Sequence, residues 1–191
     1  MKLRNARYLA RDFLDGLIQP GDAVVDATMG NGHDTLYLAQ KVGESGRVWA
    51  FDVQQAALDA TRRRLEDNGC AGRVRLILDS HANMAAYVDE PPSAILFNLG
   101  WLPGAPHGVT TRVETTLQAV NAALGLLREE ALLTICIYPG HAEGAREREA
   151  LLAWARGLDE SAYDTMLRCY LNQSGDPPLL IAVKKNRRRN K

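Results

Sequence analysis

Short apolar runs alternate with helical patterns along most of this chain, and that alternation constrains its fold more than any other feature. The runs are rich in aliphatic residues, as in strands that are buried on both faces of a sheet. The predicted strands cover residues 23–27, 47–52, 74–78, 94–98 and 131–138, and the predicted helices that follow them cover residues 33–42, 54–68, 82–88, 113–127 and 143–158. Strands that alternate with helices in this way predict a parallel sheet with helices on both faces.

The end of the chain departs from that alternation. Two further strand-like runs, at residues 165–171 and 179–184, are separated by seven residues that include a Gly-Asp-Pro-Pro turn. No helix fits in so short a connection, so one of the two strands must run antiparallel. The predicted fold class is therefore α/β: a doubly wound, Rossmann-like sheet of the class I methyltransferase type, mostly parallel, with an antiparallel strand at the C-terminal edge.

The composition is that of a globular protein, which we expect to form one domain over residues 1–191. No stretch of about 18 apolar residues predicts a membrane span, and the amphipathic N-terminus does not resemble a secretory signal. The three cysteines, Cys70, Cys136 and Cys169, form no CxxC pair and no metal-spaced cluster with histidine. They predict buried, reduced thiols, no metal site and a cytoplasmic protein. The sequence is compatible with a monomer or a homodimer.

The loop after the first predicted strand, DATMGNGHDT at residues 26–35, is the first candidate site. Its glycines allow positive φ and close approach of a ligand, and the next helix offers free N–H groups. The dinucleotide fingerprint GxGxxG would require Gly or Ala in place of Thr35. The Asp26 carboxylate suits a cationic cofactor, S-adenosylmethionine, and would repel a pyrophosphate. In the alternative interpretation, Asp34 or Thr35 only caps the helix. The candidate cofactor-binding residues here are Asp26, Thr28, Gly30, Asn31, Gly32, Asp34 and Thr35.

Acids also end the second and third predicted strands. Asp52, with Gln54 two residues later, can accept hydrogen bonds from the ribose hydroxyls of an adenosyl group. At the end of the third strand stand Asp79, Ser80 and His81, where this fold places the adenine. Asp79 can accept from the exocyclic amine of adenine, or Asp79 or Ser80 caps the next helix. Open α/β sheets bind ligands at the carboxyl ends of strands, so these residues extend the same predicted pocket.

The fourth predicted strand ends in Asn98, and Leu-Gly-Trp-Leu-Pro-Gly follows at residues 99–104. Amino-methyltransferases often carry Asp/Asn-Pro-Pro-aromatic here, whose side-chain oxygen holds the target amine and whose ring packs on the acceptor. Asn98 and Trp101 occupy the first and fourth positions, but Leu-Gly replaces the two prolines, so the similarity is partial. A core position is the alternative for Trp101. The candidate substrate-binding residues are Trp101, Leu102, Pro103, Thr110, Thr111 and Arg112.

Methyl transfer from a sulfonium is an in-line displacement that requires alignment and a free lone pair more than an enzymic nucleophile. An ammonium must first lose a proton, and His81, His107 and His141 are the titratable candidates for accepting it. A structural or solvent-facing role is the alternative for each histidine. The candidate catalytic residues are Asn98, which we also assign to the cofactor site, Trp101, His107 and His141.

Four segments together resemble one bacterial family: VVDATMGNGHDTLYLA, FDVQ, FNLGWLPG followed by VTTRVETTLQA, and ICIYPGHAEGAREREAL. This is the family labelled "putative rRNA methylase", which includes the enzyme that completes 5-methylaminomethyl-2-thiouridine at the tRNA wobble position. The resemblance covers about residues 20–185 and departs in the acceptor loop. Family members often have Tyr in place of Trp101, and Gly-Gly-Asp in place of Gly-Ala-Pro at residues 104–106.

The resemblance implies a class I enzyme that transfers a methyl group from S-adenosylmethionine to the primary amine of 5-aminomethyl-2-thiouridine in the anticodon of tRNA. It assigns the cofactor to Asp26, Gly30, Gly32 and Asp52, and the acceptor to Asn98, Trp101, Thr110 and Thr111. An enzyme of the same fold acting on rRNA or on a small-molecule amine is the first alternative. A nucleic-acid-binding module without catalysis is disfavoured by the intact loop, and a nicotinamide-dependent dehydrogenase by Thr35 and the terminal strand pair.

The formal net charge of zero does not contradict an RNA substrate, because it sums two opposite parts. The tail, residues 184–191, holds six of the 23 basic residues and no acid, so residues 1–183 carry 17 basic and 23 acidic residues. An acidic body is a poor general RNA binder, since phosphate contacts need Lys and Arg. We therefore expect a small footprint on tRNA, with the tail either binding RNA or only improving solubility.

Overall fold

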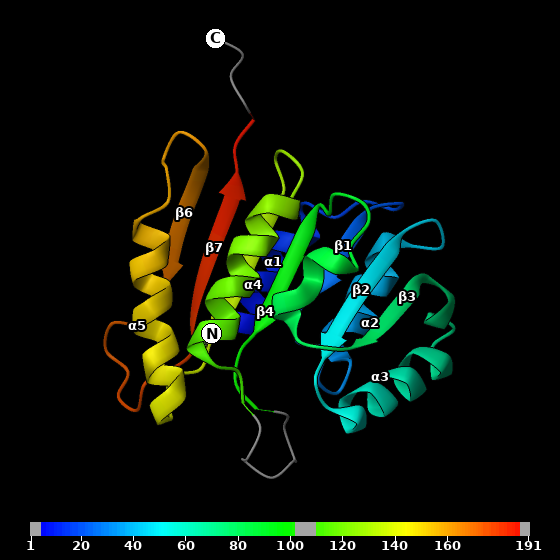
Figure 1. Cartoon of the computed structure of the whole chain (residues 1–191), viewed down its shortest axis with the longest axis horizontal. Coiled ribbons are helices and arrows are strands. Elements are labelled where there is room, and N and C mark those ends of the chain that lie inside the picture. The colour runs from blue at the N-terminus through cyan, green and yellow to red at the C-terminus, as the bar shows by residue number, and fades with distance from the viewer. Residues whose placement is uncertain (1–4, 102–109, 188–191) are drawn as a thin grey trace.

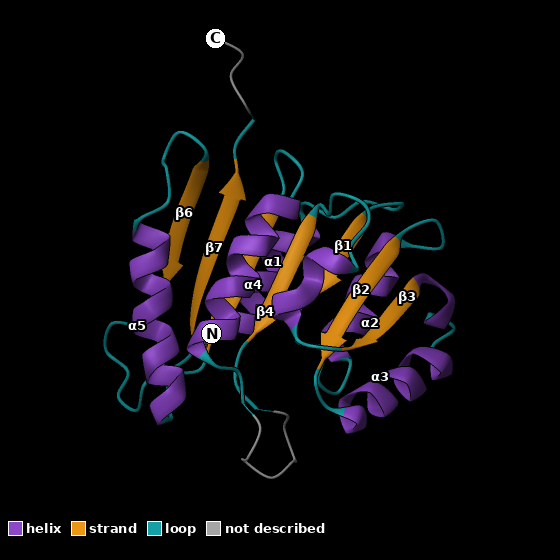
Figure 2. Cartoon of the chain, viewed as in Figure 1, coloured by secondary structure: helices purple, strands orange, loops and turns teal. Residues whose placement is uncertain are grey.

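The computed structural model describes residues 5–101 and 110–187, which form a seven-stranded sheet in the order β3-β2-β1-β4-β5-β7-β6 with helices on both faces (Figures 1 and 2). The strands are β1 (Ala23–Asp26), β2 (Arg47–Asp52), β3 (Val74–Leu78), β4 (Ala94–Asn98), β5 (Leu132–Ile137), β6 (Tyr163–Arg168) and β7 (Leu179–Lys185). The α-helices are α1 (Ala6–Asp15), α2 (His33–Val42), α3 (Gln55–Asp67), α4 (Val113–Leu126) and α5 (Ala142–Arg156), and the 3-10 helices are η1 (Ala71–Arg73) and η2 (His81–Ala86).

The predicted fold class is confirmed. Strands β1 to β5 are parallel, and β7 pairs antiparallel with both β5 and β6. Figure 1 shows β7 running opposite to its neighbours, one place inside the edge that β6 forms. The antiparallel strand is thus the second from the edge, because the short β6–β7 connection folds β7 back between β6 and β5.

Each face of the sheet buries its own apolar core. On one face, side chains of α4, α5 and η2 pack on the strands, and on the other face α1, α2 and α3 do so. Helix α1 presents Ala6, Ala10 and Leu14 to the second core, which explains the amphipathic N-terminal pattern.

Two local predictions were wrong in detail. Strand β3 is an edge strand, so Leu78 is exposed and the strand is not buried on both faces. The segment predicted as an α-helix at residues 82–88 forms the 3-10 helix η2 instead, with Ser80 at its N-cap.

All three cysteines are free, but only Cys70 and Cys136 are buried. The prediction of a buried thiol was wrong for Cys169, which is exposed because it directly follows the edge strand β6. Within the described ranges, every helix is too short or too polar to cross a bilayer.

The site is positioned by the order of the strands. Strand β1 lies between β2 and β4, so the connections from β1 and β4 leave the sheet in opposite directions along its edge. In open α/β sheets a ligand crevice forms where the order reverses in this way, outside the carboxyl ends of the strands.

Candidate functional site

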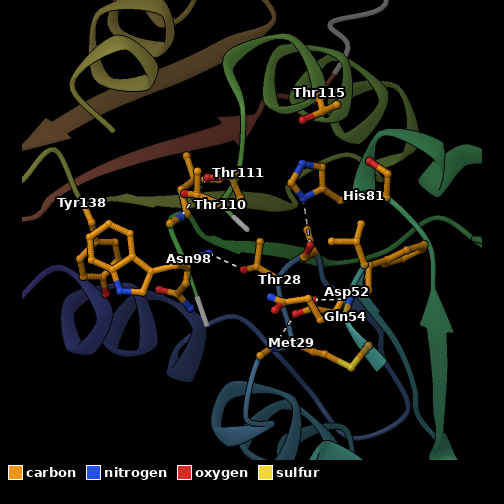
Figure 3. A pocket seen from close by; sticks show the side chains of 18 of the residues that line it. Thr28, Met29, Asp52, Gln54, His81, Asn98, Thr110, Thr111, Thr115 and Tyr138 are labelled. Carbon is orange, nitrogen blue, oxygen red and sulfur yellow. Dashed lines mark hydrogen bonds between the residues drawn. The ribbon is translucent and has the colours of Figure 1, made fainter. Parts of the chain in front are cut away.

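A cavity of about 850 Å³ lies at the carboxyl ends of β1, β2 and β4. That volume is in the range of pockets for cofactors and other small molecules. Figure 3 shows Asp52, Gln54 and Met29 on one side of the cavity and Asn98, Thr110, Thr111 and Tyr138 on the other. The predicted site residues that line it are Thr28, Gly30, Asn31, Asp34, Asp52, Gln54, Asp79, Ser80, His81, Asn98, Trp101, Thr110, Thr111, Arg112 and His141. The predicted residues Leu102, Pro103 and His107 lie outside the described residues.

Asp26 and Thr35, predicted to contact the cofactor, lie beneath the cavity and do not line it. The Asp26 carboxylate is fully buried and accepts hydrogen bonds from the Thr35 hydroxyl at 2.7 Å and the Thr28 N–H at 3.1 Å. Burial, and then the nearby charge of Asp34, raise the pKa of Asp26 to about 7. The two residues hold the first loop onto α2. The predicted contact between the Asp26 carboxylate and the sulfonium of the cofactor does not fit this position, because Asp26 does not line the cavity.

The two loop glycines have positive φ, 50° at Gly30 and 76° at Gly32, as their residue type predicts. Gly30 lines the cavity. Gly32 does not: a Cβ at Gly32 would lie 2.8 Å from Thr61 of α3. Gly32 is therefore needed for packing of the loop against α3, and close approach of a ligand is left to Gly30.

Asp52 stands at the centre of the cofactor side. Its Oδ2 accepts from the Gly30 N–H at 3.1 Å and its Oδ1 accepts from the Gln54 N–H at 3.0 Å, which fixes the plane of the carboxylate. Desolvation raises the pKa of Asp52. Each carboxylate oxygen keeps a further lone pair, so Asp52 can still accept hydrogen bonds from two ribose hydroxyls. This arrangement, with Gly30 beside it, fits S-adenosylmethionine.

The residues after β3 combine capping with pocket lining. Ser80 caps η2 by accepting from the Ala82 N–H at 3.2 Å, so the capping alternative holds for this residue. Asp79 accepts from the Tyr87 hydroxyl at 2.8 Å, the largest cause of its lowered pKa, and from Ser80 and Asn83. Most of its capacity as an acceptor is used within the protein.

The His81 ring is buried and its Nδ1–H donates to the Ala27 carbonyl at 3.1 Å. Burial lowers the pKa of His81, so the neutral ring dominates and its Nε2 carries a lone pair. The ring also packs edge-on against Phe97, at a centroid distance of 5.5 Å.

Asn98 is held by hydrogen bonds of both its backbone and its side chain. Its backbone N–H donates to the Thr28 hydroxyl at 2.7 Å, a bond drawn in Figure 3, and its Nδ2 donates to Asp34 Oδ2 at 2.7 Å. Its Oδ1 is buried and accepts from no group among residues 5–101 and 110–187. The residue that sequence analysis assigns to the acceptor thus offers an unused hydrogen-bond acceptor.

Trp101 pairs with Thr110 in an isolated antiparallel bridge, at the two ends of the loop that the structure leaves undescribed. Its side chain is 37% exposed and lies against His141, with ring centroids 4.4 Å apart. The core alternative for Trp101 is therefore wrong, because its ring stands at the rim of the cavity.

His141 is the N-cap of α5, where its Nδ1 accepts from the Gly144 N–H at 3.1 Å. That bond requires an unprotonated Nδ1, so the neutral ring carries its proton on Nε2. His141 lines the cavity as predicted, and its Nδ1 is occupied by the cap of α5.

Three residues in or beside the site, Arg7, Tyr138 and Glu147, were not predicted from the sequence. Arg7 and Tyr138 line the cavity from α1 and from the end of β5, and burial raises the pKa of Tyr138 to about 12. Glu147 of α5 is 1% exposed and accepts from the hydroxyls of Thr111 and Thr116, at 2.9 and 2.7 Å. The charged sequence around Glu147 gives no signal that this acid is buried.

A Rossmann-like sheet with an antiparallel β7, and a glycine and carboxylate pocket at its topological switch point, defines a class I S-adenosylmethionine-dependent methyltransferase. The chain belongs to the family described as "Putative rRNA methylase", whose model matches residues 48–184. It is also 33% identical over 195 residues to the chloroplastic tRNA (mnm5s2U34)-methyltransferase of Arabidopsis thaliana, over 95% of this chain and 70% of that protein.

Solved structures of similar sequence share the fold. A "putative rRNA-methylase" from Clostridium thermocellum has a TM-score of 0.95 at 40% identity, covering 97% of this chain and 100% of that one. A "putative methyltransferase" from Streptococcus mutans, solved in complex with SAH, has a TM-score of 0.88 at 37% identity, covering 96% and 99%. The predicted family and cofactor, and the prediction that the protein is a methyltransferase, are therefore confirmed.

Proposed function

We propose that this protein transfers a methyl group from S-adenosylmethionine to the primary amine of 5-aminomethyl-2-thiouridine at the wobble position of tRNA, giving 5-methylaminomethyl-2-thiouridine. The observation that carries the proposal is Asn98 Oδ1, a buried acceptor without a donor among the described residues, on the wall of the cavity. The similarity to the tRNA methyltransferase of Arabidopsis thaliana supports the substrate.

Bound S-adenosylmethionine supplies a methyl group on a sulfonium, which is open to displacement by a lone pair. Asp52 and Gly30 would hold the cofactor, and Asn98 Oδ1 would accept an N–H of the target amine and so fix the direction of the nitrogen lone pair. Transfer would form an N–C bond to the methyl group and release S-adenosylhomocysteine as the leaving group. The methylated ammonium then releases its proton to water. Alignment of this kind is the main contribution that such a displacement needs from the protein.

Trp101 provides the surface for the base. Its ring lies at the rim of the cavity, and an anticodon base that is turned out of its stack can pack on such a ring. Arg112 also lines the cavity and can contact a phosphate. The free thiols of Cys70, Cys136 and Cys169 suit a cytoplasmic protein, where tRNA would be met.

The test is to incubate the purified protein with S-adenosylmethionine and bulk tRNA from cells that lack the gene, and to measure nucleosides by mass spectrometry. We expect 5-aminomethyl-2-thiouridine to gain one methyl group. Unchanged tRNA together with methylated rRNA would instead support the alternative substrate that the family description names. Methylation of a free amine with both RNAs unchanged would support a small-molecule acceptor.

Two variants locate the acceptor site. Asn98→Ala should keep affinity for S-adenosylhomocysteine and lose most turnover, because it removes the oxygen that orients the amine. Asn68→Ala, at an exposed asparagine after α3, is the matched control and should behave as the wild type. Unimpaired turnover of Asn98→Ala would remove Asn98 from the acceptor site.

A further inference from the structure

The Asp34 carboxylate, in the first turn of α2, is the meeting point of three side chains. Its Oδ1 accepts from Arg11 Nε at 2.8 Å and Nη2 at 2.5 Å, and its Oδ2 accepts from Arg7 Nε at 2.8 Å and Asn98 Nδ2 at 2.7 Å. Asp34 is only 6% exposed. All of these partners are donors, so the Asp34 carboxylate acts here only as an acceptor of hydrogen bonds.

This contact decides how the amide of Asn98, a residue that lines the cavity, is oriented. The two ends of an asparagine amide have nearly the same shape, so packing alone does not choose between them. Only the NH2 end can bond to a carboxylate, so Asn98 turns its Nδ2 to Asp34 and its Oδ1 away from it. That oxygen is the buried acceptor that has no donor among the described residues.

We propose that Asp34 is a positioning residue that orients the Asn98 amide and thereby restricts the acceptor to a group that can donate a hydrogen bond, as an amine does. This inference rests on the proposed function, and it reassigns Asp34 from the cofactor to the acceptor side of the cavity. It also explains the role of α1, since Arg7 and Arg11 of that helix both donate to the Asp34 carboxylate, Arg7 to the same oxygen as Asn98.

The arrangement also selects the charge state of the acceptor. Arg7 and Arg11 compensate the negative charge of Asp34, and Arg7 itself lines the cavity. The amine therefore meets a neutral amide oxygen instead of a free carboxylate. An uncharged amine satisfies that oxygen with one N–H and keeps its lone pair, whereas an ammonium gains no ion pair here.

The experiment exchanges the two groups. Asp34→Asn presents a second amide to Asn98 and allows the Asn98 amide to flip, whereas Asn98→Asp sets two carboxylates against each other. The double variant Asp34→Asn/Asn98→Asp restores a donor facing an acceptor and again leaves an oxygen toward the cavity. We expect kcat to fall about 100-fold in each single variant, as for removal of one oriented polar group in other enzymes. The double variant should recover about tenfold or more of that loss.

Three controls separate positioning from structural damage. Affinity for S-adenosylhomocysteine, measured by calorimetry, should stay within about threefold in every variant, because the orientation of Asn98 acts on the acceptor. Asp15→Asn removes another ion pair between α1 and α2, that of Asp15 with Lys41 at 2.6 Å, and should leave turnover unchanged. In the double variant, a carboxylate beside the bound amine favours the ammonium, so the acidic limb of the kcat profile should move to higher pH.

A side-chain measurement keeps this inference separate from the proposed substrate. The Asn98 side-chain amide signal in a 15N–1H spectrum, assigned by its loss in Asn98→Asp, should shift in Asp34→Asn and not in Asp15→Asn. If wild-type protein leaves tRNA unmethylated while this shift occurs, the substrate is wrong and the positioning stands. Wild-type turnover in Asp34→Asn, no recovery in the double variant, or loss of turnover in Asp15→Asn would each overturn the positioning role.

Discussion

The carboxylate of Glu147 accepts a hydrogen bond from the hydroxyl of Thr111 at 2.9 Å, and this contact anchors the acceptor segment to helix α5. The same hydroxyl accepts from the Gly100 N–H at 2.9 Å, and the Thr111 N–H donates to the Gly100 carbonyl at 3.1 Å. The two segments that bear Trp101 and Thr110 are thus bonded to each other and to a buried acid. These contacts fix the backbone next to Trp101, and they thereby hold its ring at the rim of the cavity.

Glu147→Gln should lower turnover on tRNA by about tenfold or more and leave affinity for S-adenosylhomocysteine unchanged. A carboxylate accepts both threonine hydroxyls, whereas the amide has only one oxygen, so one hydroxyl loses its acceptor. Loss of a hydrogen bond to a charged group costs about 1.5–3 kcal/mol. Glu149→Gln, at an exposed position on the same helix, is the matched control. Equal turnover of the two variants would exclude an anchoring role.

Asp52→Asn should weaken binding of S-adenosylhomocysteine, measured by calorimetry, by roughly tenfold, because one of the two carboxylate oxygens becomes an NH2 that cannot accept from a ribose hydroxyl. The turnover number at saturating cofactor should change less than the affinity. Asp67→Asn, an exposed acid at the end of α3, serves as control. Wild-type affinity in Asp52→Asn would refute the assigned contact.

Asp26→Asn should change how stability depends on pH. The folded-state pKa of Asp26 is raised to about 7 from 3.8, so the folded protein binds the extra proton between these values. The free energy of unfolding of the wild type therefore falls as pH rises from about 4 to about 7, by at most about 1.4 kcal/mol per pH unit from this group.

Urea unfolding of both proteins at pH 5, 6 and 7 measures this effect. Asp26→Asn has no proton to lose there, so its stability relative to the wild type should improve steadily toward pH 7. A difference that stays constant over this range would show that Asp26 titrates below it.

The sequence predicts the fold well because the hydrophobic period and the order of the elements determine it. The five parallel strands and four of the five helices predicted after them lie within a few residues of their predicted bounds. The position of Asp52 followed in the same way, since it ends a strand next to β1. The functions of Asp26 and Asp34 did not follow. Whether such a carboxylate faces a ligand or the protein depends on contacts with Thr35 and with Arg7 and Arg11 of α1, and no local pattern encodes the α1 contacts.

The histidines show the same limit. The motif around His141 indicated a titratable group near the acceptor, but the ring caps α5, and only the bond from Gly144 shows which nitrogen holds the proton. Glu147 was not predicted because its partner Thr111 is 36 residues away in the sequence. An acid within a charged helical segment also gives no sign that it is buried. Patterns predict the residues at the strand ends, and side-chain contacts between distant segments decide their roles.

The basic C-terminal residues should contribute to tRNA affinity through charge. Replacing Arg188, Arg189 and Lys191 with Gln keeps the length of the chain and removes three positive charges from an otherwise acidic protein. Each lost contact with a phosphate should reduce the slope of log K against log salt by about 0.7 to 0.9, so the slope should flatten by about 2 if all three contacts exist. Binding of S-adenosylhomocysteine should not change.

Filter binding of tRNA between 50 and about 200 mM salt measures this slope, because tRNA affinity that depends on phosphate contacts falls steeply over that range. Equal slopes for the variant and the wild type would mean that these residues serve solubility.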